Sequence, residues 1–276
     1  MNRLKSLFIS LYLTLLSVGV IRALLLVADQ PSWWWVIIAL VPALGFFAWV
    51  FSFSVARTGT VSVIMWVPPL LALPGILAGG GASIEHLLWI AGVGLLGAFL
   101  YIRWYSVFGT RDSERLRRGN PLPELHFQNA QGDVISSEQI SGPLLLLFYR
   151  GNWCPLCMAQ IREVADQYTQ LAEKGLKLLM VSPQSHQNTA ALAQKFDVPM
   201  QFLMDKDLQA AKALGIEALN GLPAGLEVLG YESDTVMPTV IITDAAHRII
   251  YADQANNYRL RPEPAEFLRV LAEAGL

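Results

Sequence analysis

The chain has 276 residues, of which 54% are hydrophobic, and its mean hydropathy of +0.42 is too apolar for an ordinary soluble protein. The net charge is -2 and no basic stripe runs through the second half, which excludes nucleic acid as a partner because phosphate binding needs clustered lysine and arginine. The two cysteines, Cys154 and Cys157, are too few for a framework of structural disulfides.

The apolar residues are concentrated in the first 105 residues. A membrane-crossing helix needs about 20 apolar residues, and four runs of roughly this length occur, at 7–27, 33–53, 61–78 and 87–102. Residues 1–105 are therefore predicted to be an all-α transmembrane region of about four helices, which anchors an integral membrane protein in the lipid bilayer. The third run contains Pro68, Pro69 and Pro74, which work against a regular helix.

Basic residues predict the orientation of this region. Arg3 and Lys5 precede the first run, Arg57 follows the second, and several arginines follow the fourth, whereas the other two loops carry only acidic charges. Because lysine and arginine accumulate on the cytoplasmic side, both termini are predicted to lie inside the cell.

The second half has the pattern of an α/β domain. Residues 106–120 are predicted to be a polar linker, and residues 121–276 a single domain in which strands and helices alternate. The predicted strands are 125–129, 133–135, 143–149, 176–182, 201–203, 239–243 and 249–253, and the predicted helices are 155–173, 188–196, 207–214 and 264–274. Such an alternation favours a three-layer sandwich.

The two cysteines begin one of these helices, directly after a buried strand that ends at Tyr149. A thiolate at a helix N-terminus is stabilised by the helix dipole and the free amides, so its pKa falls. The spacing of Cys154 and Cys157 also allows an internal disulfide to close. Arg150 is a candidate for further stabilisation of the thiolate. A zinc site and a pair of inert buried thiols remain as alternatives, although His126, His186 and His247 lack the spacing of zinc ligands.

The segment from Phe148 to Cys157, FYRGNWCPLC, resembles the AhpC/TSA peroxiredoxin-like branch of the thioredoxin superfamily. The segments VSPQ (181–184), MPT (237–239) and NYRLRPEP (257–264) extend the resemblance over residues 121–276. It implies a thioredoxin-like fold and a redox-active Cys154/Cys157 disulfide that needs no cofactor or metal. It further implies a cis Pro238 beside the cysteines, as a third catalytic position, with support from Trp153, Pro155, Arg150 and Thr239.

The chain also departs from this family. In the family's alignment Cys157 takes the peroxidatic position, and the arginine that binds peroxide falls on Pro238. Loss of this cation should slow the attack on peroxide, because charge on the leaving oxygen would be less stabilised.

We therefore expect a membrane-anchored thiol-disulfide oxidoreductase in which Cys154 attacks a disulfide and Cys157 releases the product. The resemblance implies a thiol electron donor of the thioredoxin or glutathione type. One alternative is a thiol-dependent peroxidase, an antioxidant that reduces hydroperoxides. Another is a non-enzymatic redox sensor or metal-binding module.

The predicted topology can be tested with a reporter fused after Leu276. Since the basic loops belong on the cytoplasmic side, the reporter should give a cytoplasmic signal. An external signal would mean that the proline-bearing third run does not cross, and it would place the redox domain outside.

Overall fold

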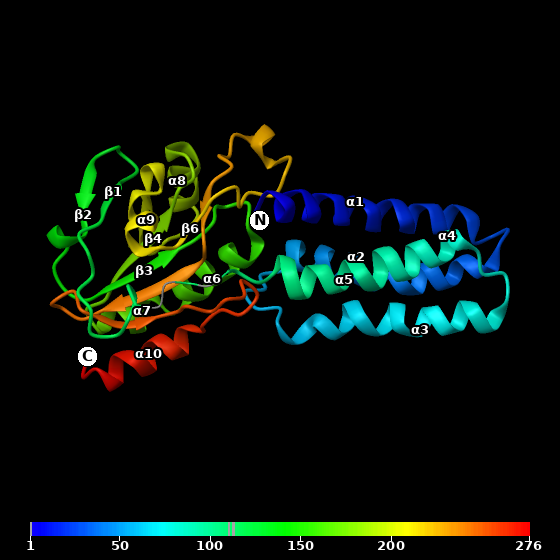
Figure 1. Cartoon of the computed structure of the whole chain (residues 1–276). Helices are drawn as coiled ribbons and strands as arrows, with labels where there is room; N and C mark the ends of the chain where they lie inside the picture. The colour runs from blue at the N-terminus through cyan, green and yellow to red at the C-terminus, as the bar shows by residue number, and fades with distance from the viewer. Residues whose placement is uncertain (1, 110, 112–113) are drawn as a thin grey trace.

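The computed structural model describes residues 2–109, 111 and 114–276, and Figure 1 shows a helical bundle at one end and an α/β domain at the other. Residues 110, 112 and 113 of the predicted linker lie outside the described residues. The bundle contains four helices that are long and apolar enough to cross a membrane: Asn2–Leu26, Pro31–Ser52, Thr60–Gly79 and Ile84–Tyr105. The predicted all-α region of about four helices is thus confirmed as a set of candidate spans.

These four helices are labelled α1 (Asn2–Leu26), α2 (Trp34–Ser52), α3 (Val63–Gly79) and a fourth that starts at α4 (Ile84–Leu87). The fourth passes through two π-helical stretches, Leu88–Leu96 and Tyr101–Tyr105, on either side of α5 (Gly97–Leu100). The prolines of the third run lie inside α3, which continues through them to Gly79.

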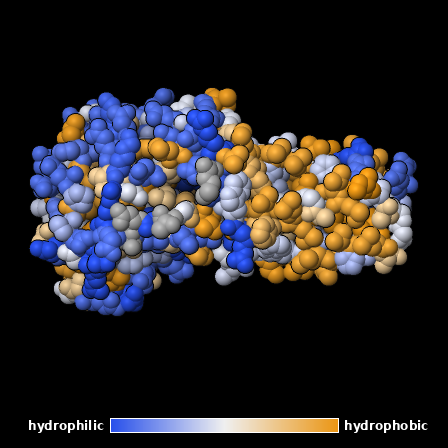
Figure 2. All heavy atoms as spheres, in the orientation of Figure 1, coloured by the Kyte–Doolittle hydropathy of each residue, from blue (hydrophilic) through white to orange (hydrophobic). Residues whose placement is uncertain are grey.

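The surface of the bundle is apolar, as the orange end in Figure 2 shows. Leucines such as Leu25 and Leu71 are 74% and 63% exposed. Arg22 and Glu85, two of the few charged residues here, pair with each other at the end far from the α/β domain. A surface of exposed leucines is unfavourable in water and favourable in lipid.

A seven-stranded mixed sheet forms the centre of the α/β domain. Its strand order is β2-β1-β5-β4-β3-β8-β9. β3 (Leu144–Phe148) pairs in parallel with β4 (Lys177–Ser182) and antiparallel with β8 (Thr239–Thr243). All five residues of β3 are buried, as expected of a central strand with both faces covered. The other strands are β1 (His126–Gln128), β2 (Val134–Ser136), β5 (Gln201–Met204) and β9 (Ile249–Ala252).

Helices cover both faces of this sheet. Leu145 and Leu147 point into the core that contains α6 (Pro155–Asp166), α7 (Tyr168–Glu173), α8 (His186–Ala193) and α10 (Pro264–Glu273). Leu144 and Leu146 point into the opposite core, with α9 (Gln209–Leu214). The fold is therefore the thioredoxin-like three-layer sandwich that the sequence predicts.

Two local features differ from expectation. The helix predicted over 155–173 breaks at Gln167, whose backbone leaves the helical region, and so gives α6 and α7. A short pair of strands, β6 (Glu217–Ala218) and β7 (Thr235–Val236), forms a second small sheet. Two residues per strand carry too little alternation for a sequence pattern to reveal them.

The bundle and the α/β domain are joined by polar contacts at one end of the helices. Arg57, in the loop between α2 and α3, bonds Glu163 of α6 at 2.7 Å. Arg259 donates to Ser62 at 2.9 Å, and the hydroxyl of Tyr258 donates to that of Tyr101 at 2.9 Å. The N-terminus of α1, the α2–α3 loop and the α/β domain thus lie at the same end of the bundle (Figure 1).

Candidate active site

Hydrogen bonds to Gln184 anchor the loop from Tyr149 to Cys154. Gln184 accepts from the amide of Asn152 at 2.8 Å and donates to the hydroxyl of Tyr149 at 3.1 Å. Gly151 has φ +149°, and a Cβ there would lie 2.6 Å from the indole nitrogen of Trp153. Glycine is therefore required at this point, where the chain turns from β3 toward α6.

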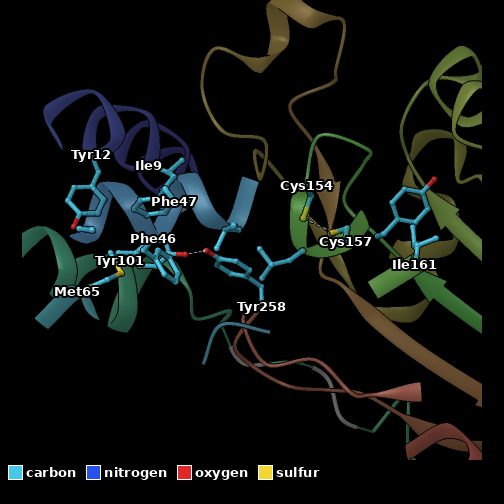
Figure 3. Close-up of a cluster of buried hydrophobic side chains, with 14 of the residues drawn as sticks. Ile9, Tyr12, Phe46, Phe47, Met65, Tyr101, Cys154, Cys157, Ile161 and Tyr258 are labelled. Atoms are coloured by element: carbon cyan, nitrogen blue, oxygen red, sulfur yellow. Dashed lines mark hydrogen bonds between the residues drawn. The ribbon is translucent and has the colours of Figure 1, made fainter. Parts of the chain in front are cut away.

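The cysteines follow at the start of α6. Cys154 precedes the first helical residue, Pro155, whose fixed φ suits that position, and Cys157 lies in the first turn. The two sulfur atoms lie 2.6 Å apart, and a dashed line in Figure 3 marks the contact between them. Both thiols are free and buried, with Cys154 3% exposed and Cys157 fully covered. A disulfide between them can close without movement of the helix.

Arg261 lies beside the inner sulfur. Its guanidinium is 3.5 Å from Sγ of Cys157, and it is held by the side chain of Gln160 at 2.8 Å and the carbonyl of Tyr258 at 3.1 Å. The Arg261 side chain is itself buried. A charge-charge contact in such a water-poor site is much stronger than on the surface.

The two thiols consequently differ in acidity. Burial and the hydrogen bond with Cys157 raise the pKa of Cys154 well above its usual range. Burial acts in the same direction on Cys157, but the bond with Cys154, the charge of Arg261 and the backbone N–H of Arg150 outweigh it and lower the pKa of Cys157 to about 5. The charges around the pair therefore favour a thiolate on the Cys157 side, which faces Arg261.

Arg150 points toward the junction with the bundle and is partly buried. Its guanidinium packs 4.7 Å from the ring centroid of Trp153 and donates to the carbonyl of Gly221. Its charge adds to that of Arg261 in favouring the thiolate at Cys157. Arg150 and Trp153 both line a cavity, together with Pro155.

This junction cavity has a volume of about 220 Å³ and lies between the bundle and the α/β domain. Cys154 is part of its wall, whereas Cys157 is not. Figure 3 shows the aromatic residues of the bundle on one side, the cysteines on the other and Tyr258 between them. The bundle, predicted only as an anchor, thus also contributes to the surroundings of the candidate site. The bundle residues that line the cavity are Ile9, Ser10, Leu13, Phe47, Val50, Phe51, Tyr101 and Tyr105.

Pro238 and Thr239 occupy other places than the resemblance implies. The peptide bond before Pro238 is trans, so the expectation of a cis proline is wrong. The amide of Met237 bonds the carbonyl of Ile216 at 2.7 Å, which continues the chain from β7 into β8 without a cis turn and leaves this donor unavailable to a substrate. Pro238 lines a small cavity with Gln160 and Arg261. Thr239 accepts a hydrogen bond from Arg111 of the linker.

Position 238 lacks the family's arginine, as expected, but another cation lies beside the inner sulfur. Arg261, 104 positions further along the chain than Cys157, brings its guanidinium to Sγ of Cys157. The segment 257–264 contributes to the resemblance, but the resemblance implies no role for Arg261. The sequence gives only a weak indication that Arg261 belongs to the site, because its neighbours are typical of an exposed loop and no local pattern predicts that its side chain is buried.

No group of three or more His, Cys, Asp or Glu side chains that could hold a metal ion is present among the described residues. The site brings together two sulfur atoms, the guanidinium groups of Arg261 and Arg150, and the first turn of a helix.

Known proteins resemble the second half of the chain. Residues 118–252 match the model of the AhpC/TSA family. The chain is 24% identical over 120 residues to Peroxiredoxin Bcp of Bacillus subtilis, covering 43% of this chain and 76% of that protein. It is 22% identical over 126 residues to the Thiol-disulfide oxidoreductase ResA of the same organism, covering 45% and 69%.

Among solved structures, Peroxidoxin BcpB from Mycobacterium tuberculosis aligns with a TM-score of 0.47 and 17% identity, over 57% of this chain and 97% of that chain. The second half of the chain is therefore similar to the AhpC/TSA family, and the protein is a thiol-dependent oxidoreductase with candidate membrane spans at its N-terminus.

Proposed function

We propose that the protein is a membrane-anchored thiol-disulfide oxidoreductase that acts through Cys154 and Cys157. Residues 1–105 are its anchor, 106–120 the linker and 121–276 the redox domain, which faces the cytoplasm. The observation that carries the proposal is that the two sulfurs differ in position and acidity. Cys154 lines the junction cavity, whereas Cys157 does not line it and has the lower pKa of the two.

The reaction starts at Cys154. As its sulfur attacks a substrate disulfide, the Cys157 thiolate 2.6 Å away accepts its proton. One substrate sulfur forms a mixed disulfide with Cys154, and the other leaves as a thiolate that takes the proton back from Cys157. The Cys157 thiolate then attacks Sγ of Cys154, closes the internal disulfide and releases the second substrate thiolate. A thiol donor of the thioredoxin or glutathione type reduces the pair again.

The low pKa of Cys157 also sets the direction in which electrons move most readily. A thiolate that is stabilised in the reduced pair favours the reduced form, and a thiol of low pKa is a good leaving group when a donor attacks Cys154. The oxidised pair is therefore easily reduced by thiols, and it is a comparatively strong oxidant.

Hydroperoxide reduction is a second candidate, and the contact between Arg261 and Cys157 is the observation that favours it. A cation at the attacking sulfur can stabilise negative charge as the O–O bond breaks. Cys157 would become a sulfenic acid, releasing an alcohol or water, and Cys154 would then displace the hydroxyl as water and close the disulfide.

The order of attack can be tested by trapping. In the Cys157→Ser variant, glutathione disulfide should leave one glutathione on Cys154, because the resolving thiol is absent. The Cys154→Ser variant should accumulate no adduct, because Cys157 does not line the junction cavity. Intact-protein mass spectrometry measures both. Adduct on Cys157 alone would contradict Cys154 as the attacking sulfur.

The role of Arg261 can be tested by titrating the thiolate absorbance of the reduced protein. The wild type should keep its thiolate as the pH falls until about 5. Arg261→Gln should raise this midpoint by about 1 to 3 pH units, since a nearby cation favours the charged form. Arg261→Lys should restore most of the effect. Arg269→Gln, which breaks only an exposed pairing with Glu266 and Glu273, is the matched control and should leave the midpoint unchanged.

Stopped-flow oxidation of the full chain can separate peroxide reduction from disulfide exchange. If Arg261 stabilises the leaving oxygen, Arg261→Gln should slow the reaction with hydrogen peroxide by about 100-fold. Arg269→Gln should not slow it. Equal rates for wild type and Arg261→Gln would remove the basis for the peroxidase candidate, while disulfide exchange would remain.

A further inference from the structure

The junction cavity is apolar and rich in flat rings. Phe47, Phe51, Tyr101, Tyr105, Trp153 and Tyr258 all contribute to its wall. Among the described residues of this wall, Arg150 is the one with a formal charge. Cys154 contributes a redox-active sulfur atom. The cavity therefore offers aromatic faces, a strong hydrogen-bond donor and a sulfur atom within one partly open space.

The size of the cavity limits what can enter. A cavity of about 150 Å³ lined by leucine and phenylalanine accepts benzene, so a volume of about 220 Å³ accommodates a single substituted ring. A protein loop carrying a disulfide is too large for it. Much of the wall belongs to α1, α2 and the end of the fourth helix, which are candidate membrane spans. The compound suited to this space is thus a small ring system that dissolves in a bilayer.

We propose that the junction cavity binds the head group of a membrane-dissolved quinone, which accepts two electrons from Cys154 and Cys157. This inference rests on the proposed function, because it gives the same cysteine pair a second electron acceptor beside a disulfide. Aromatic walls provide stacking faces for the ring, and Arg150 can donate to a quinone carbonyl. The oxidised pair takes electrons readily from thiols, so an acceptor in the membrane completes a cycle.

The step balances with the groups present. The sulfur of Cys154 adds to a ring carbon of the quinone, its proton moves to Cys157, and an electron pair moves onto the carbonyl oxygen. Cys157 loses its proton and attacks Sγ of Cys154. The S–S bond forms, the S–C bond breaks, and its electron pair returns to the ring. The one proton of the pair ends on one oxygen and a proton from water on the other, so one quinone, one singly ionised pair and one proton give one quinol and one disulfide. Substrate thiols then reduce the disulfide by exchange.

The test uses full-length reduced protein in phospholipid nanodiscs under anaerobic conditions, with decylubiquinone as the probe. Quinone absorbance should disappear as one quinol forms per cysteine pair, and the free thiols should disappear with it. Ala224→Trp fills the cavity without changing the cysteines and should slow the reaction by about tenfold or more, since addition depends on close positioning. Val228→Trp adds the same side chain to the same loop at an 85% exposed position and should react like wild type.

A second pair of variants guards against misfolding of the loop. Leu13→Trp fills the cavity from α1, and Leu24→Trp places tryptophan on the outer surface of the same helix. Only the first should slow quinone reduction, and an azidoquinone should label cavity residues in Leu24→Trp but not in Leu13→Trp.

The failure of this inference is distinguishable from failure of the proposed function. A glutathione adduct on Cys154 in the Cys157→Ser variant, with no reduction of quinone by the wild type, would overturn the inference and leave thiol exchange in place. Equal quinone rates in Ala224→Trp and Val228→Trp would also overturn it, as would consumption of cumene hydroperoxide with the quinone left untouched. If neither the adduct nor the quinol formed, both proposals would fall.

Discussion

The negative charge that the two buried sulfurs share is the constraint on which the site depends. A thiolate removed from water is costly unless it is paired and hydrogen-bonded. Here Arg261, the backbone N–H of Arg150 and the second thiol supply that compensation. Any change that moves Arg261 should therefore alter the acidity of the two thiols, even if α6 and β3 remain intact. The strand-loop-helix motif places the sulfurs, but the guanidinium groups give them unequal roles.

Arg261 is positioned by the segment that also joins the bundle to the α/β domain. Tyr258 bonds Tyr101 of the fourth helix, Arg259 bonds Ser62, and the carbonyl of Arg259 accepts from the amide of Thr58 at 3.1 Å. Two residues later Arg261 contacts Cys157. Docking of the bundle and the acidity of Cys157 are therefore structurally linked. An isolated α/β domain would lose Tyr101 as a partner of Tyr258 and would expose the wall that carries Cys154.

The parts of the protein that sequence predicts well are those set by local patterns. The unbroken apolar run of β3, the start of α6 at Pro155 and the four apolar helices each follow from neighbouring residues alone. The contact between Arg261 and Cys157 does not, because it joins residues 104 positions apart and depends on how the chain after β9 crosses the sheet. The trans peptide before Pro238 depends on a bond from Met237 to Ile216, which no local pattern contains. The junction cavity exists only once the bundle and the α/β domain are packed together.

That packing also governs how different reaction partners reach Cys154. The loop that contributes Ala224 to the cavity wall is held on α1 by several bonds, including Asn2 to the carbonyl of Leu219 at 2.8 Å and Ser10 to that of Ala224 at 2.6 Å. Bonds of this kind contribute about 0.5 to 1.5 kcal/mol each, so the loop can be displaced at a cost of a few kcal/mol. A thiol protein would have to meet that cost before its sulfur could contact Cys154. A small compound that fits the cavity as it stands does not have to displace the loop, because the loop keeps its bonds to α1. Large and small partners therefore reach the same sulfur at different cost, and the bonds between the loop and α1 set that difference.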